Sequence, residues 1–140
     1  MEQYLLFKLG DEYFGIIIEL IENIERLTPF TRVPKAASYI KGVMNLRGEI
    51  IPVIDIKERL DLGSYLKTED TRVLIINWKN DFKVGFLVDE VFDVINISKD
   101  SIEQVSKDKD EFKWTIAKYN HILVNLLNVE DILFDKIQEV

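Results

Sequence analysis

Short apolar runs alternate with polar turn residues along the whole chain. Runs of four to eight residues rich in Val, Ile, Leu and Phe, bounded by Gly, Asn, Asp or Pro, are typical of β-strands. Helical patterns are short: a turn that Ser38 could cap, residues 57–60, and residues 128–134, which begin with an Asn that can cap the helix. The pattern therefore predicts an all-β fold with a few short helices.

The strand pattern occurs twice. Residues 5–18 align with residues 75–88, and each copy consists of an apolar strand, a polar turn and a second strand that carries a Gly. Residues 40–54 align in the same way with residues 112–126. Turns rich in Gly, Asn and Asp between apolar strands predict β-hairpins, and self-similarity of this kind indicates a duplicated structural unit.

Each copy would be marginal as an isolated fold, since a domain of roughly 65 residues buries only about 60% of its unfolded surface. We therefore expect one domain, residues 1–140, built of two small five-stranded β-barrels around a shared hydrophobic core. The expected division is approximately residues 15–85, with swapped terminal strands, and residues 86–140 plus the N-terminal strand. Residues 27–34, with two prolines, and the polar residues 98–111 are interpreted as connections.

Composition narrows the possible functions. The 140 residues are 47% hydrophobic and include no Cys and one His, which argues against thiolate metal sites, thiol catalysis and multi-histidine metal centres. No metal or cofactor is expected. The start of the chain lacks a signal-peptide pattern, and no apolar run approaches the roughly 18 residues of a membrane span. We expect a soluble, cytoplasmic protein without direct membrane insertion.

The charge is uneven. The net charge is −7, which opposes binding to nucleic acid, yet residues 26–59 carry seven basic and three acidic side chains. A basic segment in an acidic protein can mark a face for an acidic partner. A small nucleic-acid-binding β-barrel that uses this segment is one alternative function, and no nucleic-acid partner is expected in the preferred interpretation.

A second alternative is a small acid–base enzyme. Asp89 and Asp93 form part of the densest carboxylate cluster outside the loops, and His121 is the one side chain whose ordinary pKa lies near neutrality. A solvated strand edge explains the two carboxylates better, and a turn position explains the His. The glycines do not have the spacing of a phosphate-binding loop. We therefore expect no catalytic residues.

Residues 42–55 contain the most distinctive turn. Gly48 supplies backbone freedom for a tight hairpin, so the tip should present Asn45, Arg47 and Glu49 outward. Arg is enriched at binding hot spots and pairs well with carboxylates, but Arg47 could equally bridge to Glu22 or Glu25 within the molecule. Pro52 forfeits one backbone donor, which suggests an edge strand or a bulge.

The sequence resembles the chemotaxis coupling protein family, the CheW-like domain, over about residues 3–135. The matching segments are Phe-Lys-Leu-Gly-Asp-Glu at 7–12 with Phe-Gly-Ile at 14–16, Thr-Arg-Val-Pro at 31–34, the whole of 39–55 with its Asn-Leu-Arg-Gly turn, and Val-Asp-Glu-Val at 88–91. Two departures are Asn23, where family members often have an acid, and Trp114, where many keep Gly.

The resemblance implies two SH3-like barrels and a non-enzymatic adaptor. Family members couple the cytoplasmic hairpin of a chemoreceptor, a methyl-accepting chemotaxis protein, to the regulatory domain of the histidine kinase CheA. The receptor contacts are expected in the groove between the barrels. By motif position, the expected receptor-binding residues are Ile21, Asn23, Gly42, Asn45, Arg47, Val88 and Val91.

Overall fold

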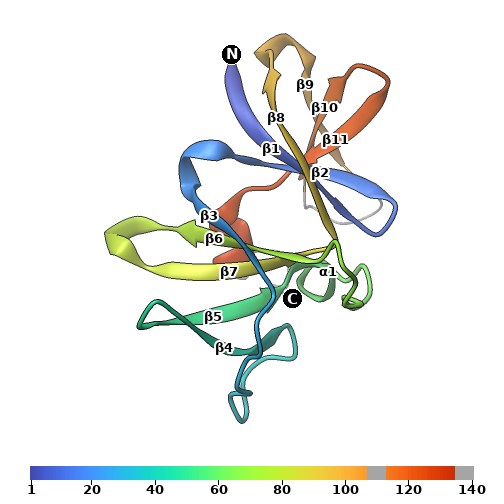
Figure 1. Cartoon of the computed structure of the whole chain (residues 1–140). Coiled ribbons are helices and arrows are strands. Elements are labelled where there is room, and N and C mark those ends of the chain that lie inside the picture. Colours follow the sequence, from blue (N-terminus) through green and yellow to red (C-terminus); the bar gives the residue numbers. More distant parts are fainter. Residues whose placement is uncertain (107–112, 135–140) are drawn as a thin grey trace. The chain divides into compact units, whose positions relative to one another are not determined.

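The computed structural model describes residues 1–106 and 113–134, which form eleven β-strands and two short α-helices (Figure 1). The strands fall into two compact units. The terminal unit combines residues 1–18 with the chain from residue 92 onward, and the central unit comprises residues 19–91. The prediction of a mostly β chain with two small β substructures is confirmed.

The terminal unit contains a six-stranded sheet, one strand more than expected. Its strand order is β8 (Glu90–Ile97), β1 (Glu2–Leu9), β2 (Glu12–Ile17), β11 (Ile122–Leu126), β10 (Lys113–Tyr119) and β9 (Ile102–Ser106). Helix α2 (Val129–Leu133) follows β11, and the Asn128 side chain accepts a hydrogen bond from the Glu130 amide at its start, as the sequence predicted. The buried core of this sheet contains Leu6, Ile95, Ile97, Ala117 and Val124.

The central unit contains a five-stranded sheet. Its order is β3 (Ile21–Arg26), β6 (Arg72–Asn77), β7 (Lys83–Val88), β5 (Glu49–Asp55) and β4 (Ile40–Leu46), and helix α1 (Ile56–Arg59) follows β5. Three short 3-10 turns complete the described elements: η1 (Ile18–Leu20), η2 (Lys79–Asp81) and η3 (Lys99–Ser101). The buried core of the sheet contains Met44, Ile51, Val53, Val73, Ile75 and Leu87.

The sequence repeat corresponds to a structural repeat. The aligned segments form matching hairpins, β1–β2 with β6–β7 and β4–β5 with β10–β11. Each unit joins two hairpins by a parallel pair, β2 with β11 in the terminal unit and β7 with β5 in the central unit. In the terminal unit β11 follows β2 by about a hundred residues, because the whole central unit lies between them in the chain. The two units are therefore not consecutive halves of the sequence.

The interpretation of residues 98–111 as a connection is wrong in part. Residues Ile102–Ser106 form β9, which pairs antiparallel with β10. The two apolar residues of β9 stand among polar neighbours, so the strand has little hydrophobic signal of its own and is specified by its partner. Residues 107–111 lie outside the described residues. Residues 27–34 do lack a helix or named strand, as expected.

Pro52 does not mark an edge strand. Strand β5 lies between β7 and β4 in the sheet, and its register shift with β4 falls at Ile40–Gly42 rather than at the proline. The parallel pairing of β5 with β7 begins at Val53, one residue after Pro52. The missing N–H therefore costs no hydrogen bond in the ladder with β7, and an interior strand tolerates the proline.

Gly42 is buried at the point where the connecting segment of residues 27–34 crosses β4. Thr31 and Val43 exchange two backbone hydrogen bonds of 2.8 Å, which bring the Thr31 carbonyl directly over the Gly42 Cα. A Cβ on Gly42 would lie 2.2 Å from that carbonyl oxygen, and the φ of Gly42 is +154°. Only a residue without a side chain permits this crossing.

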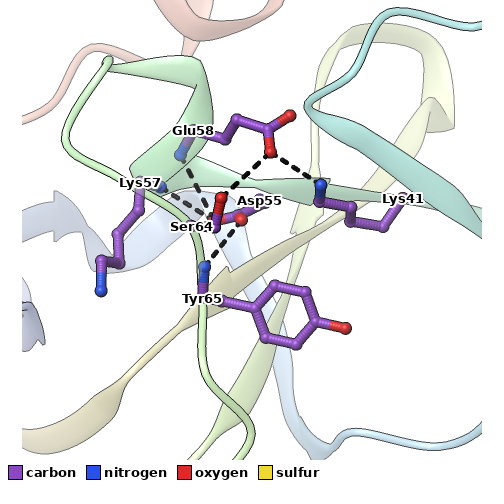
Figure 2. Close-up of polar contacts among 6 residues, drawn as sticks. All are labelled: Lys41, Asp55, Lys57, Glu58, Ser64 and Tyr65. Atoms are coloured by element: carbon purple, nitrogen blue, oxygen red, sulfur yellow. Dashed lines mark hydrogen bonds and ion pairs between the residues drawn. The ribbon is translucent and has the colours of Figure 1, made fainter.

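A polar cluster holds α1 and the loop that follows it (Figure 2). The buried Asp55 carboxylate caps the helix by accepting hydrogen bonds from the Lys57 and Glu58 amides, and its second oxygen accepts one from the Tyr65 amide at 2.9 Å. Burial raises the pKa of Asp55, although the hydrogen bonds from Tyr65 and Glu58 oppose that rise. The cluster has the geometry of a helix cap and loop clamp, and it explains the helical turn predicted at residues 57–60.

The Glu58 side chain extends this cluster outward. It accepts a hydrogen bond of 2.8 Å from the Lys41 ammonium and one of 3.4 Å from the Ser64 hydroxyl. Burial acts to raise its pKa, but the hydrogen bonds from Lys41 and Ser38 outweigh burial, so the pKa of Glu58 lies below its ordinary value of 4.5. The ionised form of Glu58 is therefore stabilised by folding.

Replacing Gly42 with Ala should lower the free energy of unfolding by about 2–4 kcal/mol, because the new methyl group displaces the Thr31 crossing. Gly48→Ala is the matched control. Gly48 also has a positive φ, of +86°, but no atom lies within 4 Å of its Cβ position, so only a backbone cost of about 1 kcal/mol is expected. Urea unfolding of both variants measures the difference, and equal losses would contradict a steric role for Gly42.

The pair of Lys41 and Glu58 should make stability depend on pH. Because the folded pKa of Glu58 is lowered, its contribution is present above about pH 4.5 and is lost as the pH falls through the folded pKa. Lys41→Gln should therefore destabilise the protein by about 1 kcal/mol at pH 7, with the gap to the parent shrinking toward about pH 4. Urea unfolding at several pH values tests this, with the exposed Lys35→Gln as control; a gap that grows on acidification would refute it.

Candidate functional site

The hairpin between β4 and β5 turns on Arg47 and Gly48. Both residues have positive φ, +50° and +86°, as a two-residue type I′ hairpin requires. Such a φ is costly for Arg, and the Asn45 side chain offsets part of the cost by accepting a hydrogen bond of 3.0 Å from the Gly48 amide. The predicted tip is confirmed, since Asn45, Arg47 and Glu49 are all exposed.

The Arg47 side chain lies along the end of β3. Its Nη2 is 3.4 Å from an oxygen of Glu25, so the alternative of an internal bridge is realised with Glu25 rather than with Glu22. The pair is long, and the Arg47 side chain remains 68% exposed. A surface pair of this kind contributes little stability, and most of the guanidinium donors remain open to a partner.

Lys83 supports the same hairpin from β7. Its ammonium lies 2.9 Å from Glu49 and 3.1 Å from Glu22, which links β5, β7 and β3 at one end of the sheet. The hydrogen bonds that the Lys83 ammonium donates to Glu49 and Glu22 raise the pKa of Lys83, so it stays charged throughout the neutral range. These two ion pairs of Lys83 hold the hairpin tip in position, and neither of them involves the Arg47 side chain.

Strand β3 contributes two of the expected residues. Ile21 pairs with Ile76 and Asn23 with Ile75, so the register shifts at Glu22, which is the extra residue of a β-bulge. A bulge re-aims a side chain, and here it directs Glu22 to Lys83. Ile21 and Asn23 are half-buried, as is Glu25, the partner of Arg47.

The other expected receptor-binding residues in regular strands, Val91, Gly42 and Val88, differ in how deeply they are buried. Val91, in β8, is half-buried. Gly42 is buried and Val88 is 1% exposed, so neither offers a free side chain to a partner in this structure. Both have structural contacts: Gly42 permits the backbone crossing, and Val88 pairs with Arg72, the first residue of β6.

Three residues near the hairpin were missed by the sequence analysis. Lys83 is one, and its position directly after the turn at residues 79–81 was the only sequence signal. The others are apolar: Ile50 is 63% exposed beside Glu49, and Phe82 is 48% exposed beside Lys83. Ile50 begins the apolar run of β5 and Phe82 stands just before the apolar strand β7, so their sequence context suggested core rather than surface.

The acid–base alternative finds no support in the geometry. Asp89 belongs to the central unit and lies 3.3 Å from the Lys57 ammonium, whereas Asp93 and His121 belong to the terminal unit and are exposed. Within residues 1–106 and 113–134 no three His, Asp or Glu side chains are grouped to hold a metal ion. In the same ranges no helix is long and apolar enough to cross a membrane.

The hairpin is therefore suited to recognition. It presents an exposed guanidinium on a turn that Asn45 and Lys83 hold in place, next to the exposed side chain of Ile50. Arg is enriched at protein-binding hot spots, and its planar guanidinium suits carboxylate partners.

Comparisons with known proteins agree with the fold and the motif. Residues 3–136 match the CheW-like domain. The chemotaxis protein CheW of Bacillus subtilis (strain 168) is 37% identical over 136 residues, covering 94% of this chain and 86% of that protein. The chemotaxis protein CheW of Helicobacter pylori is 35% identical over 134 residues, covering 94% and 81%.

A solved structure shows the same similarity. The crystal structure of the scaffolding protein TtCheW from Thermoanaerobacter tengcongensis is similar with a TM-score of 0.83 at 29% identity, covering 99% of this chain and 92% of that chain. The resemblance inferred from the motifs is confirmed, and with it the expectation of a chemotaxis scaffold in place of an enzyme. The chain belongs to the CheW-like domain family.

Proposed function

We propose that this protein is a cytoplasmic adaptor that couples the cytoplasmic hairpin of a chemoreceptor to the regulatory domain of a histidine kinase such as CheA. The observation that carries the proposal is the family match over nearly the whole chain, which includes the Asn-Leu-Arg-Gly hairpin. An adaptor of this kind needs no catalytic group. It needs two surfaces that can be occupied at the same time.

The receptor surface in this proposal lies on the central unit, around the Arg47 hairpin. Ile21, Asn23, Asn45 and Arg47 supply contacts, and Val91 lies at the start of β8 beyond the end of β7. Gly42 and Val88 are buried, so they shape the surface. A helical hairpin presents apolar side chains at helical spacing, which suits Ile21 and the exposed Ile50, and a carboxylate on it would pair with Arg47.

Arg47 is the residue best suited to set the orientation of the receptor. The guanidinium forms two parallel hydrogen bonds with a carboxylate, and such pairs carry geometric specificity. Its internal partner Glu25 stands at 3.4 Å, which is long for a charge-assisted hydrogen bond, so exchange for an external carboxylate costs little. The weak contact with Glu25 thus keeps the Arg47 guanidinium near the position in which it would bind a receptor carboxylate.

The kinase surface is proposed at an end of one of the β units, away from the Arg47 hairpin. End-to-end pairing with a domain of the same fold is what the family resemblance implies for the kinase. The two binding events should then be separable by substitution, because the receptor residues all belong to residues 21–91 and cluster at β3, β4–β5 and the β7–β8 junction.

Arg47→Ala should weaken binding of a receptor cytoplasmic fragment by about tenfold, since a central Arg of a protein interface is commonly a hot spot. Kinase binding should be unchanged. Stability should change by less than about 0.5 kcal/mol, because Ala and Arg bear the same positive φ and the side chain is exposed. Calorimetric titration with each partner and urea unfolding measure the three quantities.

Lys35→Ala is the matched control for this experiment. Lys35 is also an exposed cation with a positive φ, of +64°, so its loss reproduces the change of charge and backbone type. It should leave receptor affinity within about twofold. Equal receptor affinity for Arg47→Ala and the parent would refute the role of Arg47, and an unfolded Arg47→Ala would make its contact with Glu25 structural.

The adaptor model also predicts a ternary complex. A kinase regulatory domain and a receptor fragment should each bind the protein alone, and together they should bind without displacing one another. Size-exclusion chromatography with light scattering measures the composition of the mixture. Competition between the two partners for one protein molecule would contradict the adaptor function.

A further inference from the structure

Two arginines face each other at one end of the central sheet. Arg26, the last residue of β3, stands directly opposite Arg72, the first residue of β6, in the antiparallel register. Side chains at directly opposed positions lie on the same face with Cβ atoms about 5 Å apart, and like charges there are destabilising. The protein is acidic overall, so this pair is the reverse of what its composition would favour.

A cavity of about 240 Å³ opens at the same place, entirely within the central unit. Arg26, Arg72 and Lys67 line it, together with the apolar side chain of Leu27 and one acidic residue, Glu69. Three cations and one carboxylate give the lining a charge of +2 in a protein whose net charge is −7. The volume is that of a small molecule rather than of a peptide segment.

The Arg72 guanidinium is held in position by the backbone. Its Nη1 donates to the carbonyl oxygens of Glu69 and Thr71, both at 2.8 Å. Both of the side-chain hydrogen bonds that Arg72 makes with residues 1–106 and 113–134 come from this one nitrogen. The remaining N–H groups of the fork are left to donate elsewhere.

The loop that supplies the rest of the lining is equally fixed. The buried Thr71 hydroxyl accepts a hydrogen bond from the Thr68 amide at 2.9 Å. The Thr68 hydroxyl oxygen in turn accepts one from the Asp70 amide at 3.1 Å, which leaves its O–H to donate into the cavity that it lines. Thr68 therefore adds a neutral donor to the cationic ones.

The cations of this cavity are not neutralised by the protein itself. Neither Arg26 nor Lys67 forms an ion pair with any residue in the described ranges. Three other lysines of the central unit are ion-paired, Lys41 with Glu58, Lys57 with Asp89 and Lys83 with Glu22 and Glu49. What distinguishes Arg26, Lys67 and Arg72 is that they line one cavity together, so their combined charge is available to a single anion from outside.

We propose that this cavity, which we call the Arg26–Arg72 pocket, binds a small free phosphate compound through its phosphate or diphosphate group. Three cations outweigh the single negative charge of one carboxylate, whereas a diphosphate offers several oxygens and more than one negative charge. An Arg fork beside a Lys is a common arrangement for phosphate recognition. Because the pocket is partly open, binding weakens as salt screens its charges.

Titration of the isotope-labelled full chain with sodium diphosphate, followed by amide NMR at low salt, tests the proposal. We expect saturable shifts concentrated at residues 26–27 and 66–72, with a Kd of about 1 mM or tighter. Sodium chloride at matched ionic strength should produce no such pattern. Sodium succinate, a dicarboxylate, should bind at least about fivefold more weakly because it offers fewer oxygens at one site.

Charge-neutral substitutions then assign the site. Arg26→Gln and Lys67→Gln should each weaken diphosphate binding by about five- to tenfold. Arg32→Gln is the matched control, since Arg32 is an exposed arginine of the same unit outside the pocket, and its Kd should stay within about twofold. Thermal unfolding of each variant verifies that the fold is intact.

Three results would overturn the proposal: absence of saturable shifts, shifts centred outside the pocket, or equal weakening in Arg32→Gln, which would indicate binding to overall positive charge. Arg26 and Lys67 are exposed, so loss of folding in their variants is not expected; should it occur, the diphosphate and succinate titrations of the parent still decide. No receptor or kinase is present, so the result is independent of the adaptor function.

Discussion

Each β unit of this protein depends on one parallel pairing of two hairpins across a glycine. In the central unit Val53 of β5 pairs with Gly85 of β7, where an added Cβ would lie 2.7 Å from the Val73 side chain. In the terminal unit Leu126 of β11 pairs with Gly15 of β2, where an added Cβ would lie 3.2 Å from Leu126. An isolated hairpin is marginal in water, so this pairing is what makes each set of hairpins a stable sheet. The rest of the fold, including the hairpin that carries Arg47, is positioned by it.

The recognition hairpin combines local strain with external support. Arg47 occupies a backbone conformation that most side chains avoid, and Asn45 and Lys83 hold the turn through hydrogen bonds and ion pairs. Strands β3 and β4 are the two ends of the strand order in the central sheet, yet Arg47 contacts Glu25 of β3. The sheet is therefore strongly curved, and the curvature gathers residues of both ends on one surface. This curvature is the physical basis for the binding surface that we propose at Ile21, Asn23 and the hairpin tip.

The basic side chains of residues 26–59 fall into two groups in the structure, those with contacts inside the protein and those exposed to a partner. Lys41 and Lys57 are ion-paired within the central unit, and the buried Arg59 packs 5.1 Å from the centre of the Tyr39 ring. Arg47 is exposed with a weak internal partner, and Arg26 lines a cavity without one. An excess of positive charge in the sequence thus separates into structural cations and cations available for recognition. Composition alone could not make that division, because it depends on which carboxylates the fold brings within reach.

The sequence by itself determined most of the strands, the repeated hairpins and the family. Alternating apolar runs and turn residues act over a few neighbouring positions, and the duplication is a property of the letters, so both could be identified without coordinates. The exposure of Arg47 on a glycine turn also followed from local chemistry. Tertiary structure decided the choice of Glu25 as its partner, the burial of Gly42 and Val88, the interior place of the strand that contains Pro52, and β9 within a polar segment. These features depend on which strands become neighbours, and a pairing between distant segments is fixed only when both partners are folded together.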